Sequence, residues 1–331
     1  MPAKPTHNLA LDLVRVTEAA ALAAGRYMGR ACKEDSDQAA VDAMRLVLNT
    51  IEMDGIIVIG EGEKDEAPML YNGESLGSGD PPRVDIAVDP IDGTRLLALG
   101  RGNAVTTVAL ADRGAMFNPG PIVYMEKIAV GPEAYGCIDL NASVRENLES
   151  IASKKHADVD DLTVVILDRS RHENLITEVR ETGARIRLMT DGDVAGAVMT
   201  AWPDSGIDVL LGVGGTPEGV LAACALKCMG GEMQGRLYPR NDEETRLALE
   251  AGYDLDQVLT MDDLVRSENI FFAITGITDG ELLDGVKYSG EGARTHSLVM
   301  RASTGTVREI IATHRWDRLM RFSEIQYDRI G

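Results

Sequence analysis

The sequence predicts a layered fold of the α/β class, with α+β character in its first half. Two amphipathic helices open the chain of 331 residues, and apolar segments typical of strands follow up to about residue 140. Beyond about residue 160, strands and helices alternate, which indicates a parallel or mixed sheet with crossover helices. Because the rhythm changes there, we expect two domains, an α+β domain over 1–160 and an α/β domain over 161–331.

The first helix is predicted by apolar residues that recur at steps of three and four from Leu9 to Tyr27, with Asn8 as its cap. The polar segment 33–38 ends this helix. The same segment opens a second helix, which we expect to continue to about Thr50.

Strands are predicted next, at 56–59 and, after a loop rich in glycine and proline, at 84–88. The second of these is expected to end where Pro90 follows Asp89, because proline fixes φ and lacks an N–H. Neighbouring strands along the chain favour antiparallel pairing. Further strands of this kind are predicted at 104–111, 123–130 and 135–140.

The second half of the chain is introduced by a helix whose first residues, Ser143 to Glu146, form a capping box. From there, strands alternate with helices. The strands are predicted at 162–168, 184–189, 207–213, 269–275 and 295–301, and the helices at 173–182, 193–201 and 217–229.

The composition argues against several classes of function. The chain carries 53 acidic against 33 basic residues, a formal charge of -20, which repels the phosphate backbone of nucleic acids. It has no stretch of about 18 apolar residues, so we expect no membrane span. The N-terminus lacks the apolar core of a signal peptide. The four cysteines match no zinc spacing, so we expect core thiols in a reduced, cytoplasmic protein.

Acidic residues cluster where the predicted strands end. Ligands of sheets with crossover helices bind where strands end and loops begin, so we expect these acids to converge on one crevice. They are Glu61 and Glu63 after strand 56–59, Asp89 and Asp92 after strand 84–88, Asp191 and Asp193 after strand 184–189, and Glu218 after strand 207–213.

Such a group of carboxylates cannot stay fully ionised without cations. Oxygen ligands with few histidines favour Mg²⁺ or Mn²⁺, and these ions commonly act on phosphate. In the segment DPIDGT (89–94), Gly93 allows close approach of the backbone and Thr94 offers a hydroxyl to a water or a phosphate. The alternative is that the acids are ordinary turn residues, or first-turn acids of helices in the case of Asp37 and Glu218.

Seven segments, in order along nearly the whole chain, resemble the bacterial class II fructose-1,6-bisphosphatases. This family belongs to the metal-dependent, lithium-sensitive phosphatases, which include the inositol monophosphatases. The segments are IGEGEKDEAPMLYNGE (59–74), DPIDGT (89–94), YMEKIAVGP (124–132), LDRSRHENLI (167–176), TDGDVAGAV (190–198), GVGGTPEGVLAACALKCMGGEMQGRL (212–237) and TGITDGELLDGVKY (275–288).

The resemblance implies the sandwich of fructose-1,6-bisphosphatase and inositol monophosphatase, in which helix and sheet layers alternate as α-β-α-β-α. It implies hydrolysis of the 1-phosphate of fructose 1,6-bisphosphate, a step of gluconeogenesis, by a divalent-metal-activated water. It also implies a homo-oligomer, a tetramer or a dimer. The first domain would then bind metal and the second the sugar phosphate.

The resemblance further implies roles for single residues. Two or more Mn²⁺ or Mg²⁺ ions would be bound by Asp37, Glu61, Asp89, Asp92 and Glu218, with the main-chain carbonyl of Ile91 as a further ligand. The catalytic group would be Thr94, which orients the attacking water, with Asp65 as its partner, and Lys33. The substrate would contact Asp92, Gly93, Thr94, Tyr124, Arg169, Ser170, Arg171, Asp191, Gly192, Asp193 and Gly215.

The chemistry of the residues agrees with these roles. Arg169 and Arg171 can grip a phosphate in bidentate fashion, although Ser170 between them stands where the family more often has proline. A second departure precedes Lys33, where the family often has glycine and an acid. His172 and His296 receive no role, because a metal-activated water needs no histidine.

Three alternatives remain at this stage. The enzyme could be a broader sugar phosphatase that also accepts sedoheptulose 1,7-bisphosphate, or one that acts on inositol phosphates. The glycine-rich turn 212–215 after an apolar strand suggests a nucleotide-binding oxidoreductase, but Pro217 occupies the last glycine position of that fingerprint. The third alternative is a metal-binding regulatory protein without catalysis.

Overall fold

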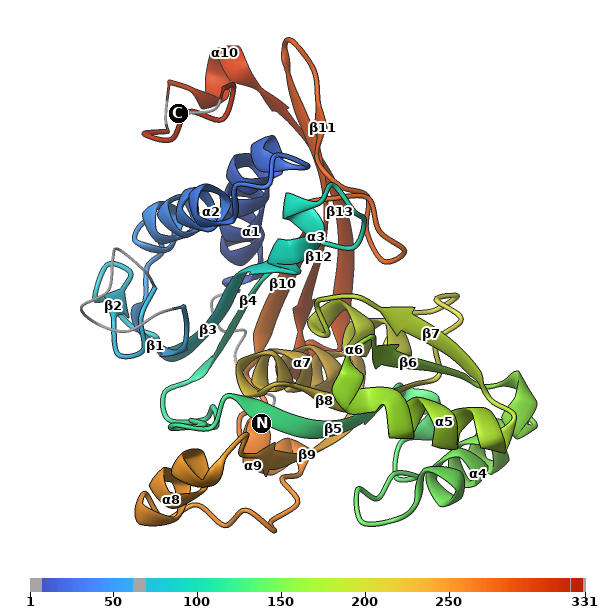
Figure 1. Cartoon of the computed structure of the whole chain (residues 1–331). Helices are drawn as coiled ribbons and strands as arrows, with labels where there is room; N and C mark the ends of the chain where they lie inside the picture. The colour runs from blue at the N-terminus through green and yellow to red at the C-terminus, as the bar shows by residue number, and fades with distance from the viewer. Residues whose placement is uncertain (1–7, 62–69, 322, 330–331) are drawn as a thin grey trace.

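The computed structural model describes residues 8–61, 70–321 and 323–329, so the predicted catalytic Asp65 and the acid Glu63 lie outside the described residues. Five layers stack in the order helices, sheet, helices, sheet, helices, as Figure 1 shows. The predicted α-β-α-β-α sandwich is therefore confirmed. The outer helices on the first sheet are α1 (Ala10–Ala24) and α2 (Lys33–Leu48), the central layer holds α6 (Val194–Ala201) and α7 (Thr216–Met229), and α4 (Val144–Lys155) and α5 (Glu173–Thr182) cover the second sheet.

The first sheet has eight strands in the order β11-β12-β10-β4-β3-β1-β2, with β13 paired to β12. It is mixed, because β1 and β3 are parallel while β3 and β4 are antiparallel. Its strands are β1 (Asp54–Ile59), β2 (Ser75–Leu76), β3 (Arg83–Asp92), β4 (Val105–Asp112), β10 (Phe271–Gly276), β11 (Lys287–Tyr288), β12 (Gly292–Arg301) and β13 (Thr306–Arg315).

The second sheet has five strands in the order β7-β6-β8-β5-β9. Strand β6 is parallel to both β7 and β8, whereas β5 is antiparallel to β8 and β9. The alternation of strands and helices beyond residue 160 thus correctly predicted a mixed sheet. The strands are β5 (Tyr124–Val130), β6 (Thr163–Leu167), β7 (Arg185–Met189), β8 (Val209–Gly215) and β9 (Glu232–Tyr238).

The pairing expected among the three segments between 104 and 140 is wrong. Strands β4 and β5 belong to different sheets, because β4 is taken up between β3 and β10 and residues 113–123 carry the chain across to the second sheet. The segment 135–140 is not a strand, since a short helix at Pro132–Ala134 and the left-handed Gly136 turn the backbone there. The two sheets also draw strands from both sides of residue 160, so the division into two domains stays a prediction.

The strand β3 is longer than the sequence indicated, because it runs through Pro90 to Asp92 instead of ending at Val88. Its register against β4 shifts between Asp89 and Asp92, as in a β-bulge, and a bulge is one of the few places where a strand accommodates proline. Gly93, with φ +95°, then turns the chain into the short helix α3 (Thr94–Ala98).

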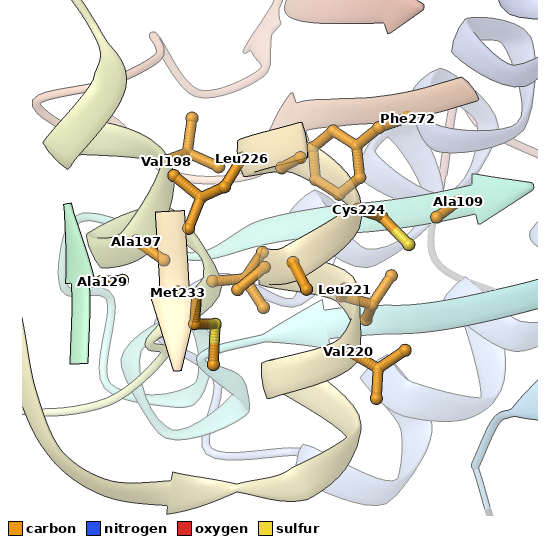
Figure 2. Close-up of a cluster of buried hydrophobic side chains, with 14 of the residues drawn as sticks. Ala109, Ala129, Ala197, Val198, Val220, Leu221, Cys224, Leu226, Met233 and Phe272 are labelled. Carbon is orange, nitrogen blue, oxygen red and sulfur yellow. The ribbon is translucent and has the colours of Figure 1, made fainter. Parts of the chain in front are cut away.

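The central helix α7 holds the core together. Figure 2 shows Leu221, Cys224 and Leu226 of this helix among side chains from both sheets and from α6. Burial raises the pKa of the Cys224 thiol to about 12, and Cys228 is buried beside it, so both are the small core residues that were expected. The expectation is wrong for Cys32 and Cys137, which are only partly buried.

The remaining helices are short and peripheral. The predicted capping box of α4 is present. The predicted cap of α1 is wrong by one residue: Leu9 is the N-cap, and Asn8 before it accepts a hydrogen bond from the N–H of Ala10 at 3.1 Å. In the described part of the chain, no helix combines the length and apolarity needed to cross a membrane. The other α-helices are α8 (Asp242–Glu250), α9 (Met261–Leu264) and α10 (Trp316–Leu319), and short 3-10 helices lie at Gly25–Tyr27, Val159–Asp161, Ser170–His172 and Ala302–Thr304.

Candidate active site

An open pocket of about 250 Å³ lies between the two sheets, where β3, β6 and β8 end. Most of the predicted site residues line it, although Glu61 and Glu218 at the two ends of the set are 157 positions apart. Those lining the pocket are Glu61, Asp89, Asp92, Gly93, Thr94, Tyr124, Arg169, Arg171, Asp191, Gly192, Asp193, Gly215 and Glu218.

Among the predicted residues that the structure describes, three do not line the pocket. Asp37 lies directly behind it, where its Oδ1 is 3.3 Å from the hydroxyl of Thr94. Lys33 and Ser170 are exposed; the charge of Lys33 acts on Asp37, while Ser170 lies at the start of a 3-10 helix.

Asp89 and Asp92 reach the pocket because of the bulge in β3. Asp89 is only 9% exposed, and its Oδ1 accepts a hydrogen bond from the N–H of Ile91 at 3.0 Å. Asp92 is 3% exposed, and its Oδ2 accepts from Val194 N at 3.1 Å and Ala195 N at 3.5 Å. Asp92, from a strand of the first sheet, therefore caps the N-terminus of α6, where the helix dipole also favours a negative charge.

Glu218 occupies the first turn of α7, after Thr216 and Pro217, so its helix-start role is real. Its carboxylate nevertheless folds back onto the end of β8. A Cβ added to Gly215 would lie 1.8 Å from its Oε2. Glycine at 215 thus provides the space that this carboxylate fills.

Burial and mutual repulsion raise the pKa of the carboxyls in this cluster. Burial is the first cause for Asp89 and Asp92, whose pKa values lie well above the usual range, and neighbouring carboxylates add to it. Burial, then Asp37 and Glu218, raise the pKa of Glu61 to about 7, although part of the Glu61 side chain reaches solvent. The donors are carboxylate oxygens that repel one another, which is the chemistry that hard divalent cations relieve.

No three His, Cys, Asp or Glu side chains within residues 8–61, 70–321 and 323–329 already surround one point at ligand distances. The fit to cations therefore rests on the donor chemistry and on the shared pocket. Thr94 adds a hydroxyl at the edge of the cluster, 3.1 Å from the carbonyl oxygen of Ile91.

The opposite wall of the pocket is basic. The guanidinium of Arg169 donates to Asp191 Oδ1 at 2.6 Å and to the carbonyl of Thr190. Arg171 donates from Nε and Nη2 to the carbonyl of Val213 at 3.0 and 2.6 Å, and its guanidinium carbon lies 4.8 Å from the ring centre of Tyr124. Both arginines are thus oriented by internal partners, and Arg171 keeps Nη1 free of those carbonyl contacts.

Sequence reasoning missed two residues that organise this wall. His172, which received no role, accepts a hydrogen bond from Val213 N at Nε2 (2.8 Å), while its Nδ1 lies 2.7 Å from the carbonyl of Leu167. The ring therefore ties β8 to the end of β6. Lys127 on β5 is buried against Asp193 at 2.6 Å. Its place between Met125 and Ala129 on one face of an apolar strand was the available signal.

With this geometry in view, the comparisons with known proteins decide the family. A family model described as bacterial fructose-1,6-bisphosphatase, glpX-encoded, matches residues 7–314. This chain belongs to that family. It is 46% identical over 324 residues to Fructose-1,6-bisphosphatase 1 class 2 of Escherichia coli strain K12, which covers 94% of this chain and 96% of the relative. The same values hold for Fructose-1,6-bisphosphatase class 2 of Escherichia coli O6:H1 and of Shigella flexneri.

Proposed function

We propose that this chain is a class 2 fructose-1,6-bisphosphatase, which hydrolyses the 1-phosphate of fructose 1,6-bisphosphate to fructose 6-phosphate and orthophosphate. The observation that carries the proposal is one pocket with two chemically different walls. Carboxylates and the Thr94 hydroxyl form one wall, and Arg171 with Tyr124 forms the other. A substrate with a phosphate at each end matches this polarity.

Thr94 would orient the attacking water. Its Oγ1 carries one proton, for which Asp37 and the carbonyl of Ile91 are the acceptors at 3.3 and 3.1 Å. The lone pairs of Oγ1 then remain available on the pocket side. Oγ1 would accept a hydrogen bond from a water there and so hold that water in place. The predicted partner Asp65 keeps its role as a hypothesis.

Two or more Mn²⁺ or Mg²⁺ ions held by Asp37, Glu61, Asp89, Asp92 and Glu218 would neutralise the charge of the phosphate and acidify a water. The chain itself would position the sugar. Asp191 and Asp193 present carboxylate oxygens to sugar hydroxyls from positions fixed by Arg169 and Lys127. Arg171, held over the ring of Tyr124, would receive the distal phosphate.

The test is phosphate release from fructose 1,6-bisphosphate with and without Mn²⁺, and then with Li⁺ as competitor. Asp89→Asn removes a charge without changing shape, and Thr94→Ala removes the hydroxyl; each should lower kcat by at least about 10³-fold. Thr94→Ser is the matched control, because it keeps the hydroxyl. Wild-type activity in Thr94→Ala would exclude the proposed role of this residue.

The same assay separates the alternatives. A substrate panel that adds sedoheptulose 1,7-bisphosphate and inositol phosphates gives kcat/KM for each compound. A higher kcat/KM for an inositol phosphate than for fructose 1,6-bisphosphate would contradict the proposed substrate. We also propose the dimer or tetramer that the family resemblance implies, which light scattering of the purified chain measures directly.

A further inference from the structure

A lysine is buried beside the carboxylate cluster. Lys127 lies on β5, and its side chain is 2% exposed. Its Nζ is 2.6 Å from Oδ2 of Asp193, whose side chain is 7% exposed. Moving charges out of water is costly, and a buried charge that loses its partner is left uncompensated.

The backbone around this pair leaves room for it. A Cβ on Gly214 would lie 1.9 Å from Oδ2 of Asp193 and 3.0 Å from Nζ of Lys127. A Cβ on Gly219, in the first turns of α7, would lie 3.6 Å from Cδ of Lys127. The lysine stem therefore runs beneath the start of α7, and its ammonium group emerges between the end of β8 and the start of α6.

This position links the pair to the proposed metal ligands. The charge of Asp193 raises the pKa of both Asp92 and Glu218, and the charge of Lys127 lowers the pKa of Glu218. Asp193 thus belongs electrostatically to the same cluster. Lys127 compensates the negative charge of Asp193 and is not among the residues that line the pocket.

We propose that Lys127 is a positioning residue that sets how strongly the carboxylate cluster attracts divalent cations, by neutralising Asp193 and holding its carboxylate away from them. This inference rests on the proposed function of the cluster as a cation site. It predicts opposite effects for the two partners of the pair. Loss of Lys127 leaves a surplus negative charge that attracts cations, and loss of the Asp193 charge leaves a surplus positive charge that repels them.

The experiment is calorimetric titration of the full-length chain with Mn²⁺ alone at pH 8, in the absence of substrate. Lys127→Met should lower the Kd for Mn²⁺ by roughly tenfold, and Asp193→Asn should raise it by a similar factor. The double variant removes both charges and should return to within about threefold of the wild-type Kd. In activity assays, Lys127→Met should raise KM for the anionic substrate.

Lys155 offers a matched control. Its Nζ also lies 2.6 Å from a carboxylate, that of Asp208, outside the residues that line the active-site pocket. Lys155→Met should therefore leave the Kd for Mn²⁺ unchanged. Thermal unfolding of all variants identifies any that fail to fold. If Lys127→Met does not fold, Lys127→Gln replaces it, because it also removes the positive charge but keeps a polar end group for Asp193, and the same tighter binding is expected.

The outcomes separate this inference from the function on which it rests. If the wild-type chain binds no Mn²⁺, the proposed cation site fails and the role of Lys127 fails with it. If the wild type binds but Lys127→Met binds equally or more weakly, only the role of Lys127 is overturned, since a purely structural pair would weaken binding in both single variants.

Discussion

Substitution of Gly215 by alanine displaces a single carboxylate, that of Glu218. The backbone at Gly215 has φ -65° and ψ 141°, which alanine adopts without strain. The added Cβ, however, would lie 1.8 Å from Oε2, 2.4 Å from Cδ and 2.6 Å from Oε1 of Glu218. The whole carboxylate group must therefore move, while the rest of the chain can stay in place.

The size of the displacement follows from the same contacts. Ordinary van der Waals contact of a Cβ begins at 3.4 Å, so Oε2 must retreat by about 1.6 Å. Metal–ligand distances tolerate only about 0.2 Å, and a misplacement of about 1 Å at a reacting centre can cost 10²-fold in rate. We expect Gly215→Ala to lower kcat/KM by at least about 10²-fold and to weaken Mn²⁺ binding. Its free energy of unfolding should change by less than about 1 kcal/mol, because the end of a glutamate side chain moves easily.

The assay pairs phosphate release with urea unfolding. Gly290→Ala is the matched control, because a Cβ there meets nothing within 4 Å and its φ is not left-handed. Wild-type kcat/KM in Gly215→Ala would refute the placement of Glu218 in the reaction centre. A large loss of stability would instead show that the carboxylate cannot move and that the clash falls on the backbone.

Three further predictions concern groups outside the cluster. Burial raises the pKa of Glu18 from 4.5 to about 7, so ionisation of this carboxyl opposes folding as the pH rises from about 4.5 to 7. Glu18→Gln should therefore be more stable than the wild type by up to about 3 kcal/mol at pH 8 but not at pH 4.5. An equal difference in the free energy of urea unfolding at both pH values would contradict this. His172→Ala removes the ring that contacts Val213 N and the carbonyl of Leu167, and should raise KM about tenfold with a smaller change in kcat; an unchanged KM would show that the ring has no positioning role. Since burial lowers the pKa of His172, the stability that this residue contributes is lost as the pH falls below about 6.5. Arg171→Lys should raise KM more than kcat falls, because lysine cannot hold both contacts to the Val213 carbonyl, and substrate titration of both enzymes measures this.

Local features of the chain could be predicted from the sequence. Periodicity located α1, the alternation of strands and helices located α5, and the residues that follow strands identified Asp89, Asp92 and Glu218 as members of one crevice. These predictions succeeded because they depend on local chemistry: apolar spacing, proline and glycine, and a carboxylate at a chain reversal. The sandwich itself came from resemblance, since no local rule orders five layers.

Other features depend on contacts between distant segments. The extension of β3 past Pro90 requires β4 as a partner that absorbs the shift in register. The role of Lys127 depends on Asp193, 66 positions away, and on Gly214, which leaves space for both. Each of these residues has an ordinary local interpretation, and the relation between them exists only after β5, β8 and α6 have packed together.

Both walls of the pocket contain residues from before and after residue 160. Asp89 and Asp92 come from β3 of the first sheet, and Glu218 comes from α7, the helix that packs against both sheets. On the other wall, Tyr124 from before residue 160 stacks with Arg171 from after it. Because each wall joins the two halves, neither half carries the complete proposed cation site or the complete proposed phosphate site. The pocket therefore forms only when the central helix layer has brought both sheets together, and we expect the proposed cation binding and the packing of α7 to stabilise the same folded state.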